Sequence, residues 1–179
     1  MTDQSFSLVP FPSATVLPSV TMEGTFARRA GTLTVRYTLR GRLGEVVIPE
    51  PAAMPARKRG LWEETCFEFF FAVRTSPRYW EVNLSPAGHW NVYRFAAYRQ
   101  GMEEERDFLS LPFRVERQSD SLSLGLELDL KRIARVDQVL DVAVSAVLKR
   151  KDGSLSYWAL THRGPQPDFH RRESFVVAL

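Results

Sequence analysis

The segment at residues 61–71, LWEETCFEFFF, combines acids and aromatic residues in a pattern that could bind a ligand. Its odd positions within 67–73 form an apolar face, whereas Glu68 lies on the even face among residues that prefer burial. A carboxylate in such surroundings needs hydrogen-bond or charge partners, because an unpaired buried charge is costly. Glu68 is therefore either a structural acid, for which Arg94 is a natural partner, or part of a polar binding surface.

Two more polar residues alternate with apolar ones in the next segment, 79–84. If 65–73 and 79–84 pair as a hairpin, Glu68 comes near Glu81 and Asn83 on one face, and the three line a shallow polar trough. Two carboxylates at a defined separation are also the requirement for glycoside hydrolysis. No nucleophile geometry is identifiable around them, so we predict that the protein is not an enzyme.

Trp62 differs from the other tryptophans in its surroundings. Trp80 and Trp158 alternate with aliphatic residues, which predicts core positions, and Trp90 at a strand entrance fits either core or surface. Trp62 instead lies beside acids, Glu64 among them, at a junction of loop and strand. An exposed indole next to carboxylates and amides suits a sugar ring, and stacking plus a few hydrogen bonds gives about 4 to 6 kcal/mol, or millimolar to tens of micromolar binding.

Short alternating segments separated by turn residues predict an all-β protein. The sequence Asp152-Gly153 is the strongest hairpin signal, and 65–97 is predicted to form three consecutive antiparallel strands. Helical signal is limited to a turn or two at 129–136. The predicted strands are 32–41, 45–48, 65–73, 79–84, 89–97, 113–117, 120–130, 142–149, 155–162 and 174–179.

About ten antiparallel strands with little helix predict a jelly-roll or immunoglobulin-like β-sandwich. A chain of 179 residues with 44% hydrophobic and 25% charged residues is typical of one globular domain, here 1–179.

No apolar run is long enough for a membrane helix, and the prolines and acid of 1–20 do not form a signal peptide. The single cysteine, Cys66, fits a reducing compartment, so we expect a cytoplasmic protein. A net charge of +3 with scattered basic clusters predicts no nucleic-acid partner.

Three sequence blocks resemble the bacterial DOMON-like proteins, a group related to the family 9 carbohydrate-binding modules. The blocks are LWEETCFEFFF, YWEVNLSPAGHWNVYRFAAYRQGM and YWALTHRGPQPDFHRRESFVVAL, and the resemblance covers nearly the whole chain. It implies a jelly-roll β-sandwich. In the carbohydrate-binding relatives a W-x-x-D-x-x-E-x-F segment supplies a ligand-stacking tryptophan and polar contacts, which Trp62 and Glu68 match. Thr65 stands where an aspartate often occurs, which weakens the transfer of a calcium or polar contact there.

The same resemblance implies a second wall for the site. In the relatives the segment before the last strand approaches the ligand, so Phe169 and His170 are expected to face Trp62. The alternative is that 167–170 is a structured loop whose polar groups only satisfy backbone atoms. The predicted ligand-binding residues are Trp62, Glu64, Glu68, Glu81, Asn83, Trp90, Arg94, Phe169 and His170.

Several functions stay open alongside a non-catalytic module for a saccharide or a saccharide-containing metabolite. The wider DOMON group is thought to bind sugars or haem, and haem needs axial ligands such as histidine or methionine; His89, His162 and His170 are the three histidines. No specific ligands support haem or calcium, so no cofactor is predicted. An adaptor that binds another protein through an exposed sheet, or a homodimer, is a further alternative; no membrane partner is expected.

Overall fold

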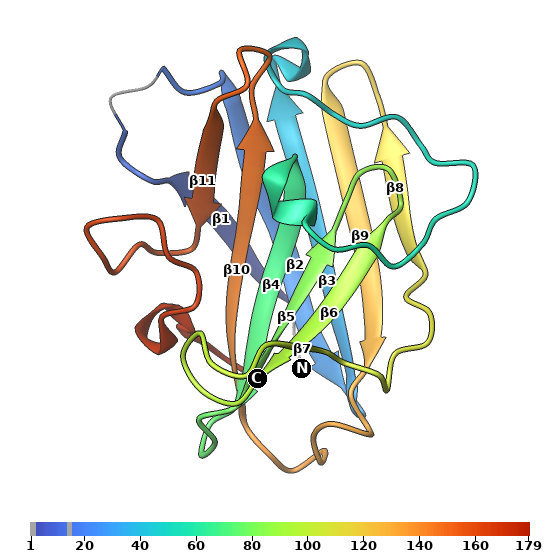
Figure 1. Ribbon diagram of the computed structural model, residues 1–179, viewed down its shortest axis with the longest axis vertical. Coiled ribbons are helices and arrows are strands. Elements are labelled where there is room, and N and C mark those ends of the chain that lie inside the picture. The colour runs from blue at the N-terminus through green and yellow to red at the C-terminus, as the bar shows by residue number, and fades with distance from the viewer. Residues whose placement is uncertain (1–2, 14–15) are drawn as a thin grey trace.

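The computed structural model describes residues 3–13 and 16–179, which form a β-sandwich of two antiparallel sheets (Figure 1). Strand β1 also pairs with β11 through Val9 and Pro10, so the two sheets join along one edge. Sheet A has the order β1 (Gln4–Pro10), β2 (Val20–Arg29), β3 (Thr32–Gly41), β9 (Ser121–Asp129), β8 (Phe113–Arg117). Sheet B has the order β7 (Glu103–Glu104), β6 (Trp90–Phe95), β5 (Tyr79–Leu84), β4 (Cys66–Val73), β10 (Leu140–Lys149), β11 (Leu155–Ala159), and β12 (Val177–Ala178) also pairs with β10.

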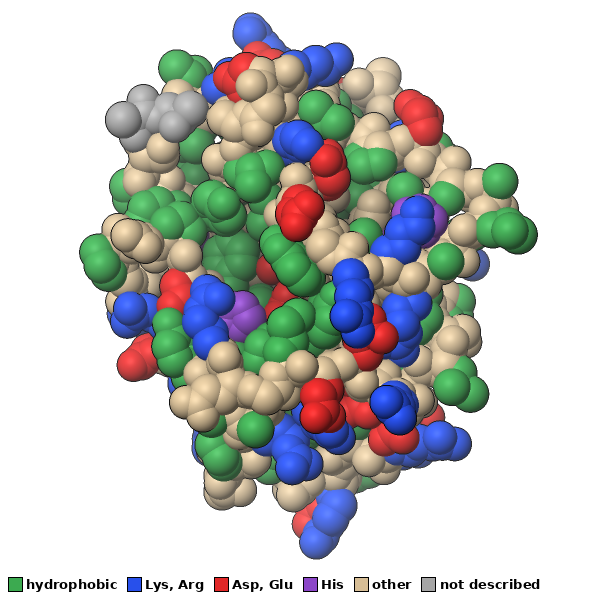
Figure 2. Space-filling view, in the orientation of Figure 1, with side chains coloured by type: hydrophobic (Ala, Val, Ile, Leu, Met, Phe, Trp, Pro, Cys, Tyr) green, Lys and Arg blue, Asp and Glu red, His purple; other side chains and the backbone are tan. Residues whose placement is uncertain are grey.

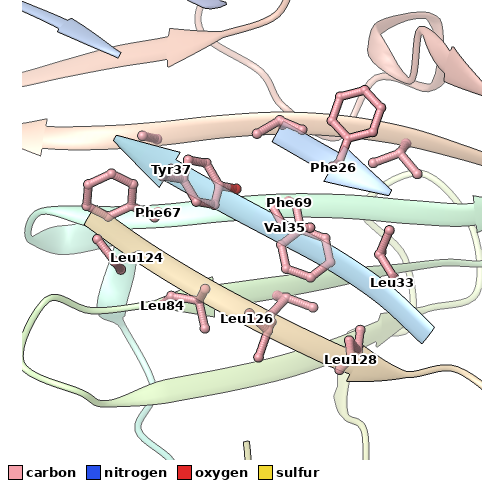
Figure 3. Close-up of a cluster of buried hydrophobic side chains, with 14 of the residues drawn as sticks. Phe26, Leu33, Val35, Tyr37, Phe67, Phe69, Leu84, Leu124, Leu126 and Leu128 are labelled. Atoms are coloured by element: carbon pink, nitrogen blue, oxygen red, sulfur yellow. The ribbon is translucent and has the colours of Figure 1, made fainter. Parts of the chain in front are cut away.

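Strand β4 is buried on both faces, which explains its unusual richness in phenylalanine. Its odd-numbered side chains, such as Phe67 and Phe69, enter the core between the sheets, where they meet leucines of β9 and Tyr37 of β3 (Figure 3). The Tyr37 hydroxyl donates a 2.6 Å hydrogen bond to the backbone carbonyl of Glu68. This bond ties sheet A to the strand that carries the candidate site.

The outer face of sheet B carries a second apolar cluster. Its members are Phe70, Ala72, Tyr79, Tyr93, Phe95, Ala143 and Phe175, with Phe169 packed against them. Phe169 and Phe175 belong to the C-terminal segment, which folds back over sheet B before β12. Sheet B is therefore covered on both sides, and the cluster supplies a firm base for whatever lies on that outer face.

The predicted all-β sandwich is confirmed. β4, β5 and β6 pair in sequence order, and the Asp152-Gly153 turn joins β10 to β11, with Gly153 at a φ of +85°. The segment 129–136, predicted to make a turn or two, forms hydrogen-bonded turns, with the backbone N–H groups of Ile133 and Ala134 bonded to the Leu130 carbonyl.

The differences from the prediction concern strands. The prediction of a strand at 45–48 is wrong, because Val46 forms only an isolated bridge to Arg150. Within 174–179 only β12 is extended. β1 and β2 were not predicted, because prolines flank them and the alternation of β2 is broken around Gly24. Of the described residues, none lies in a helix long and apolar enough to cross a membrane.

Candidate functional site

A cavity of about 470 Å³ opens on the outer face of sheet B. Figure 2 shows this face with a hollow surrounded by hydrophobic side chains, with acidic side chains and a histidine beside it. Strands β4, β5, β10 and β11 supply its floor, and loops supply its rim. The lining residues are Trp62, Glu63, Glu68, Glu81, Phe95, Arg99, Met102, Val147, Leu155, Tyr157, Pro167, Phe169 and His170.

Two carboxyl groups, Glu68 of β4 and Glu81 of β5, lie on the floor and are only 3% and 4% exposed. The register pairs Glu68 with Asn83 and Phe70 with Glu81, so the two acids are diagonal neighbours on one face, as predicted. Burial, and then repulsion from Glu81, raise the pKa of Glu68 well above its ordinary value. Burial also raises the pKa of Glu81 to about 7, against a hydrogen bond from Asn83. Both groups thus favour their protonated forms more than a surface acid does.

A polar row crosses sheet B at Glu68. Ser145 of β10 and Asn83 of β5 are its cross-strand partners on either side. The Asn83 side-chain nitrogen donates a 2.9 Å hydrogen bond to Glu81. Within the described chain, however, Glu68 Oε1, Asn83 Oδ1 and Ser145 Oγ have no hydrogen-bond partner. The floor therefore offers buried oxygen atoms whose hydrogen-bonding capacity the protein itself does not satisfy.

Trp62 stands at the rim in a 3₁₀ helix, Leu61–Glu63, that begins after Gly60. Gly60 has a φ of +71°, a left-handed conformation that glycine adopts without strain and that turns the chain into this helix. The indole is 36% exposed and lines the cavity. Its ring packs edge-on against Tyr93 of β6, with centroids 5.8 Å apart. The rim position predicted from the sequence is what the structure has.

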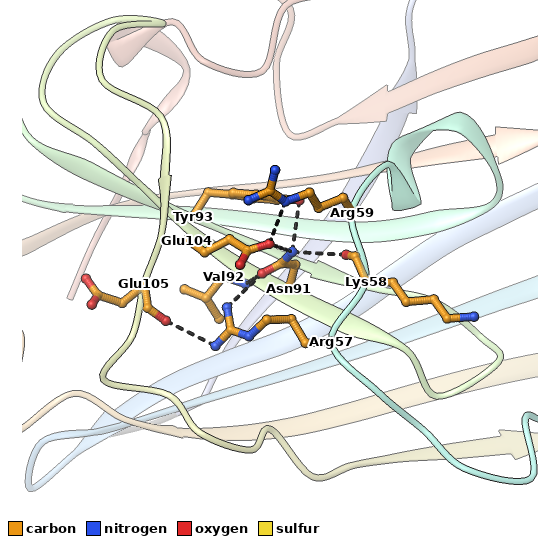
Figure 4. A network of polar contacts seen from close by, with 8 residues as sticks. All are labelled: Arg57, Lys58, Arg59, Asn91, Val92, Tyr93, Glu104 and Glu105. Carbon is orange, nitrogen blue, oxygen red and sulfur yellow. Dashed lines mark hydrogen bonds and ion pairs between the residues drawn. The ribbon is translucent and has the colours of Figure 1, made fainter.

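A polar network around Asn91 of β6 supports this rim (Figure 4). The Asn91 amide accepts a 2.8 Å hydrogen bond from Arg57 and donates bonds to the Lys58 carbonyl, the Tyr93 hydroxyl and Glu104. Arg57 also donates to the backbone carbonyls of Glu105 and Phe108. The network joins the segment before Trp62 to β6 and β7, and it fixes the tyrosine against which the indole rests.

Asp168 anchors the opposite wall, which comes from the C-terminal loop. It accepts hydrogen bonds from the Tyr98 hydroxyl, from Arg99 at 2.9 Å and from the backbone N–H of His170. Burial opposes ionisation of Asp168, but the hydrogen bonds from Tyr98 and Arg99 outweigh it and lower its pKa. A charged Asp168 thus holds the loop against residues 98–99 and places Phe169 and His170 on the cavity.

The His170 ring is wedged among Phe70, Tyr79 and Phe95, with centroids 5.1 to 5.9 Å away. Burial, and then the charge of Arg99, lower its pKa to about 4, so the imidazole is neutral at pH 7. The Tyr79 hydroxyl accepts the Arg99 backbone N–H and forms a 2.8 Å hydrogen bond with Nδ1 of His170. The Nε2 atom lies 3.8 Å from Glu81, too far for a hydrogen bond.

Three residues predicted for the site lie outside the cavity lining. Glu64 is exposed and forms an ion pair with Lys149. Trp90 pairs with Leu84 and is buried in the core between the sheets, beneath the Arg57 guanidinium. Arg94 pairs with Glu103 and not with Glu68, because the register places Tyr93, not Arg94, opposite Glu81.

Asn83 is a fourth predicted site residue outside the lining, and Thr65, the position where the relatives often have an aspartate, also has structural partners. Asn83 lies behind the floor as the hydrogen-bond partner of Glu81. Thr65 is fully buried, donates to the Val47 carbonyl and accepts from the Lys149 N–H, so its side chain joins strands instead of contacting a ligand. Of the described residues, no group of three or more histidine, cysteine or acidic side chains is placed to hold a metal ion.

Several lining residues were not predicted. Leu155 and Tyr157 follow from the alternation of β11, since Trp158 points into the core and its neighbours must point outward. Arg99 and Met102 lie on the loop after β6, where no periodic pattern exists, and Arg99 has a φ of +52°. Nothing in the sequence indicated that this loop reaches the cavity.

A larger depression of about 880 Å³ lies on the outer face of sheet A, across β3, β9 and β8. Its charged side chains, among them Arg36, Arg114 and Glu127, are exposed. Such a surface is typical of a solvated sheet face. The buried polar groups distinguish the cavity on sheet B, which we therefore take as the candidate site.

Comparisons with known proteins support the fold. No protein-family profile and no curated protein sequence matches the chain. A candidate carbohydrate-binding protein from Bacteroides uniformis has a similar structure, with a TM-score of 0.72, 14% identity, and coverage of 96% of this chain and 84% of that one. A family 9 carbohydrate-binding module from Caldicellulosiruptor kristjanssonii, solved with cellotriose and with glucose, has a TM-score of 0.50 and 9% identity; 81% of this chain is covered, and 67% and 69% of the two module chains.

Proposed function

We propose that this protein is a non-catalytic module that binds a small saccharide, or a metabolite containing one, in the cavity on sheet B. The observation that carries the proposal is the placement of a partly exposed indole, Trp62, on the same cavity as the buried carboxyl groups of Glu68 and Glu81. A sugar presents a C–H face that suits an aromatic ring and hydroxyl groups that suit oxygen acceptors.

The structural neighbours support the same class of ligand. One is a module crystallised with glucose and with cellotriose, and its fold is that of this chain. The second wall of the cavity, with Phe169 and Tyr157 at 6.2 Å between ring centroids, adds further apolar surface. In this arrangement Trp62, Phe169 and Tyr157 contact the apolar face of the sugar, and the acids of the floor bind its hydroxyl groups.

The similar solved structures, and not the state of the two acids, argue against glycoside hydrolysis. Burial raises the pKa of Glu81 to about 7 and the pKa of Glu68 well above its ordinary value, which does not by itself separate a hydrolase from a binding site. The neighbours in complex with glucose and cellotriose are carbohydrate-binding modules. Binding without catalysis is the function that we propose.

The residues at this site favour a saccharide over haem. Met102 and His170 both line the cavity and are the types of residue that bind haem iron. Both ring nitrogens of His170 face other groups, however: Nδ1 bonds the Tyr79 hydroxyl and Nε2 faces Glu81 at 3.8 Å. The Nε2 atom makes no hydrogen bond with any described residue, but the ring is wedged among Phe70, Tyr79 and Phe95 beside a buried carboxyl group, so we favour a saccharide over haem.

Isothermal titration calorimetry with glucose and cellotriose tests the proposal. We expect dissociation constants between tens of micromolar and millimolar for the wild type. Trp62→Ala should weaken binding roughly tenfold or more, about 1.4 kcal/mol, because the stacking surface is lost. Trp62→Phe should restore part of the affinity. Calorimetry is preferable to fluorescence, because the substitution removes the reporting indole itself.

Leu109→Ala is a suitable control, since Leu109 is 91% exposed and does not line the cavity. It should bind the sugars as the wild type does. If neither sugar, nor any of a panel of other mono- and disaccharides, binds the wild type, the proposed function is wrong. Equal affinities of the wild type and Trp62→Ala would remove the indole from the site.

A further inference from the structure

The floor of the cavity has an excess of acidic groups that the protein does not neutralise. Glu68 and Glu81 are both buried, and Glu63 adds a third acid at the rim. Glu68 Oε1 has no hydrogen-bond partner in the described chain, although the residue is 3% exposed and lines the cavity. A buried carboxyl oxygen in this state gains free energy from any ligand that brings a donor to it.

The surrounding described residues bring one cation near the pair, Arg99, whose charge opposes the rise in the pKa of Glu81 without outweighing burial. Arg99 is the one arginine or lysine among the described lining residues, and its guanidinium is bonded to Asp168 at 2.9 Å. His170 faces Glu81 as a neutral ring.

The cysteine and tyrosines that lie near the pair in the described part of the chain are neutral. Cys66 on β4 and Tyr93 on β6 both have raised pKa values because of burial, so both are neutral at pH 7. Tyr79 on β5 and Tyr37 behind β4 are likewise neutral.

The free hydrogen-bonding atoms next to the pair are mainly acceptors. Asn83 Oδ1 is an acceptor without a partner among the described residues, and one hydrogen of its amide nitrogen is bonded to Glu81. Ser145 Oγ can donate or accept, but it contributes one hydrogen at most. The unsatisfied Glu68 oxygen on the floor therefore favours a ligand that brings a donor, and a positive charge on that ligand would lower the raised pKa values of the two acids.

We propose, on the basis of the proposed function, that the saccharide carries a free amine and that its ammonium group lies against Glu68 and Glu81. An ammonium group supplies three donors, and its positive charge would favour the ionised forms of Glu68 and Glu81, whose pKa values burial raises. The face of Trp62 adds a favourable environment for a cation. A neutral sugar supplies hydroxyl donors only, an N-acetylated amine has one donor and no charge, and an acidic sugar meets like charges.

Calorimetric titrations at pH 7 with glucosamine hydrochloride, glucose, N-acetylglucosamine and sodium glucuronate, at matched ionic strength, test this inference. We expect glucosamine to bind at least tenfold more tightly than glucose and glucuronate to bind most weakly. Glu68→Gln should reduce the ratio of glucosamine to glucose affinity to threefold or less. Glu81→Gln should reduce it in the same direction, which guards against a folding defect in one variant.

Glu64→Gln is the matched control, because Glu64 lies four residues before Glu68 yet is exposed and outside the cavity lining. Its preference for glucosamine should equal that of the wild type. Equal affinities of the wild type for glucose and glucosamine would overturn the amine assignment and leave the proposed function standing. A preference that survives in both Glu68→Gln and Glu81→Gln would overturn it as well, and binding of no sugar at all would remove both proposals.

Discussion

Glu81 accepts a hydrogen bond from Asn83 on the cavity floor, and burial raises its pKa to about 7. In the unfolded chain a glutamate titrates near pH 4.3. Between these two values the folded protein binds more protons than the unfolded chain, so the free energy of unfolding falls as the pH rises. Above pH 7 the contribution is constant. Glu68, whose pKa is also raised, acts in the same direction.

Glu81→Gln should remove this dependence. Relative to the wild type, the variant should gain about 2 to 3 kcal/mol in the free energy of unfolding between pH 5 and pH 8. The contribution of His170 to the pH dependence has the opposite sign, because its lowered pKa makes the free energy of unfolding rise with pH between about 4 and 6.5. That contribution is present in both proteins and cancels in the comparison. Urea denaturation at several pH values measures the difference.

Glu64→Gln again serves as the control, since an exposed acid should give a difference near zero at every pH. A difference between Glu81→Gln and the wild type that stays constant from pH 5 to pH 8 would show that Glu81 is not held as a high-pKa acid.

At the residue scale the sequence predicted the acids better than their partners. The alternation of 65–73 was enough to place Glu68 on the face opposite Phe67 and Phe69. The predicted partner of Glu68, Arg94, was wrong. A shift of one residue in the pairing of β5 with β6 decides whether Tyr93 or Arg94 lies on this face. Turn geometry sets that register, and it is not visible in the alternation itself.

Strand β4 separates two apolar clusters, and this division links the fold to the site. Phe69 lies in the core between the sheets, and Phe70 lies in the outer cluster, where it contacts His170 at 5.2 Å and Phe169 at 6.5 Å between centroids. Both side chains are fully buried. Adjacent residues of one type thus support different parts of the molecule.

Phe70→Leu and Phe69→Leu form a matched pair. Each should lower the free energy of unfolding by about 1 to 2 kcal/mol, because each leaves a small void in a packed cluster. Phe70→Leu should also weaken saccharide binding severalfold, since it loosens the wall that carries His170. Phe69→Leu should bind within twofold of the wild type. Urea denaturation and calorimetry measure the two effects, and equal losses of affinity would contradict this division of roles.

At the element scale, prediction succeeded where the pattern was local. β3, β9 and the hairpin between β10 and β11 follow from alternation and a two-residue turn signal. β1 and β2 lack clean alternation, and their pairing depends on contacts with distant strands. The loop after β6 reaches the cavity through the bonds of Arg99 to Asp168, which are separated by 69 residues.

For the whole molecule, the strand content and the arrangement of two sheets follow from the sequence, because many short alternating segments and few helical ones leave little else. The position of the cavity does not. It depends on the C-terminal segment crossing the outer face of sheet B, where Phe169, His170 and Phe175 pack on β4, β5 and β6. No local pattern in 163–176 indicates which sheet that segment covers.

The most direct test of a saccharide site at Trp62 is NMR of the tryptophan indole N–H groups during titration with glucose and with glucosamine. The chain has four tryptophans, and Trp80, Trp90 and Trp158 are buried in the core between the sheets. Trp62→Phe assigns the fourth signal. We predict that the Trp62 signal shifts progressively and saturates while the other three stay nearly unchanged. A Trp62 signal that does not move at saturating sugar, or shifts confined to the core tryptophans, would contradict the account.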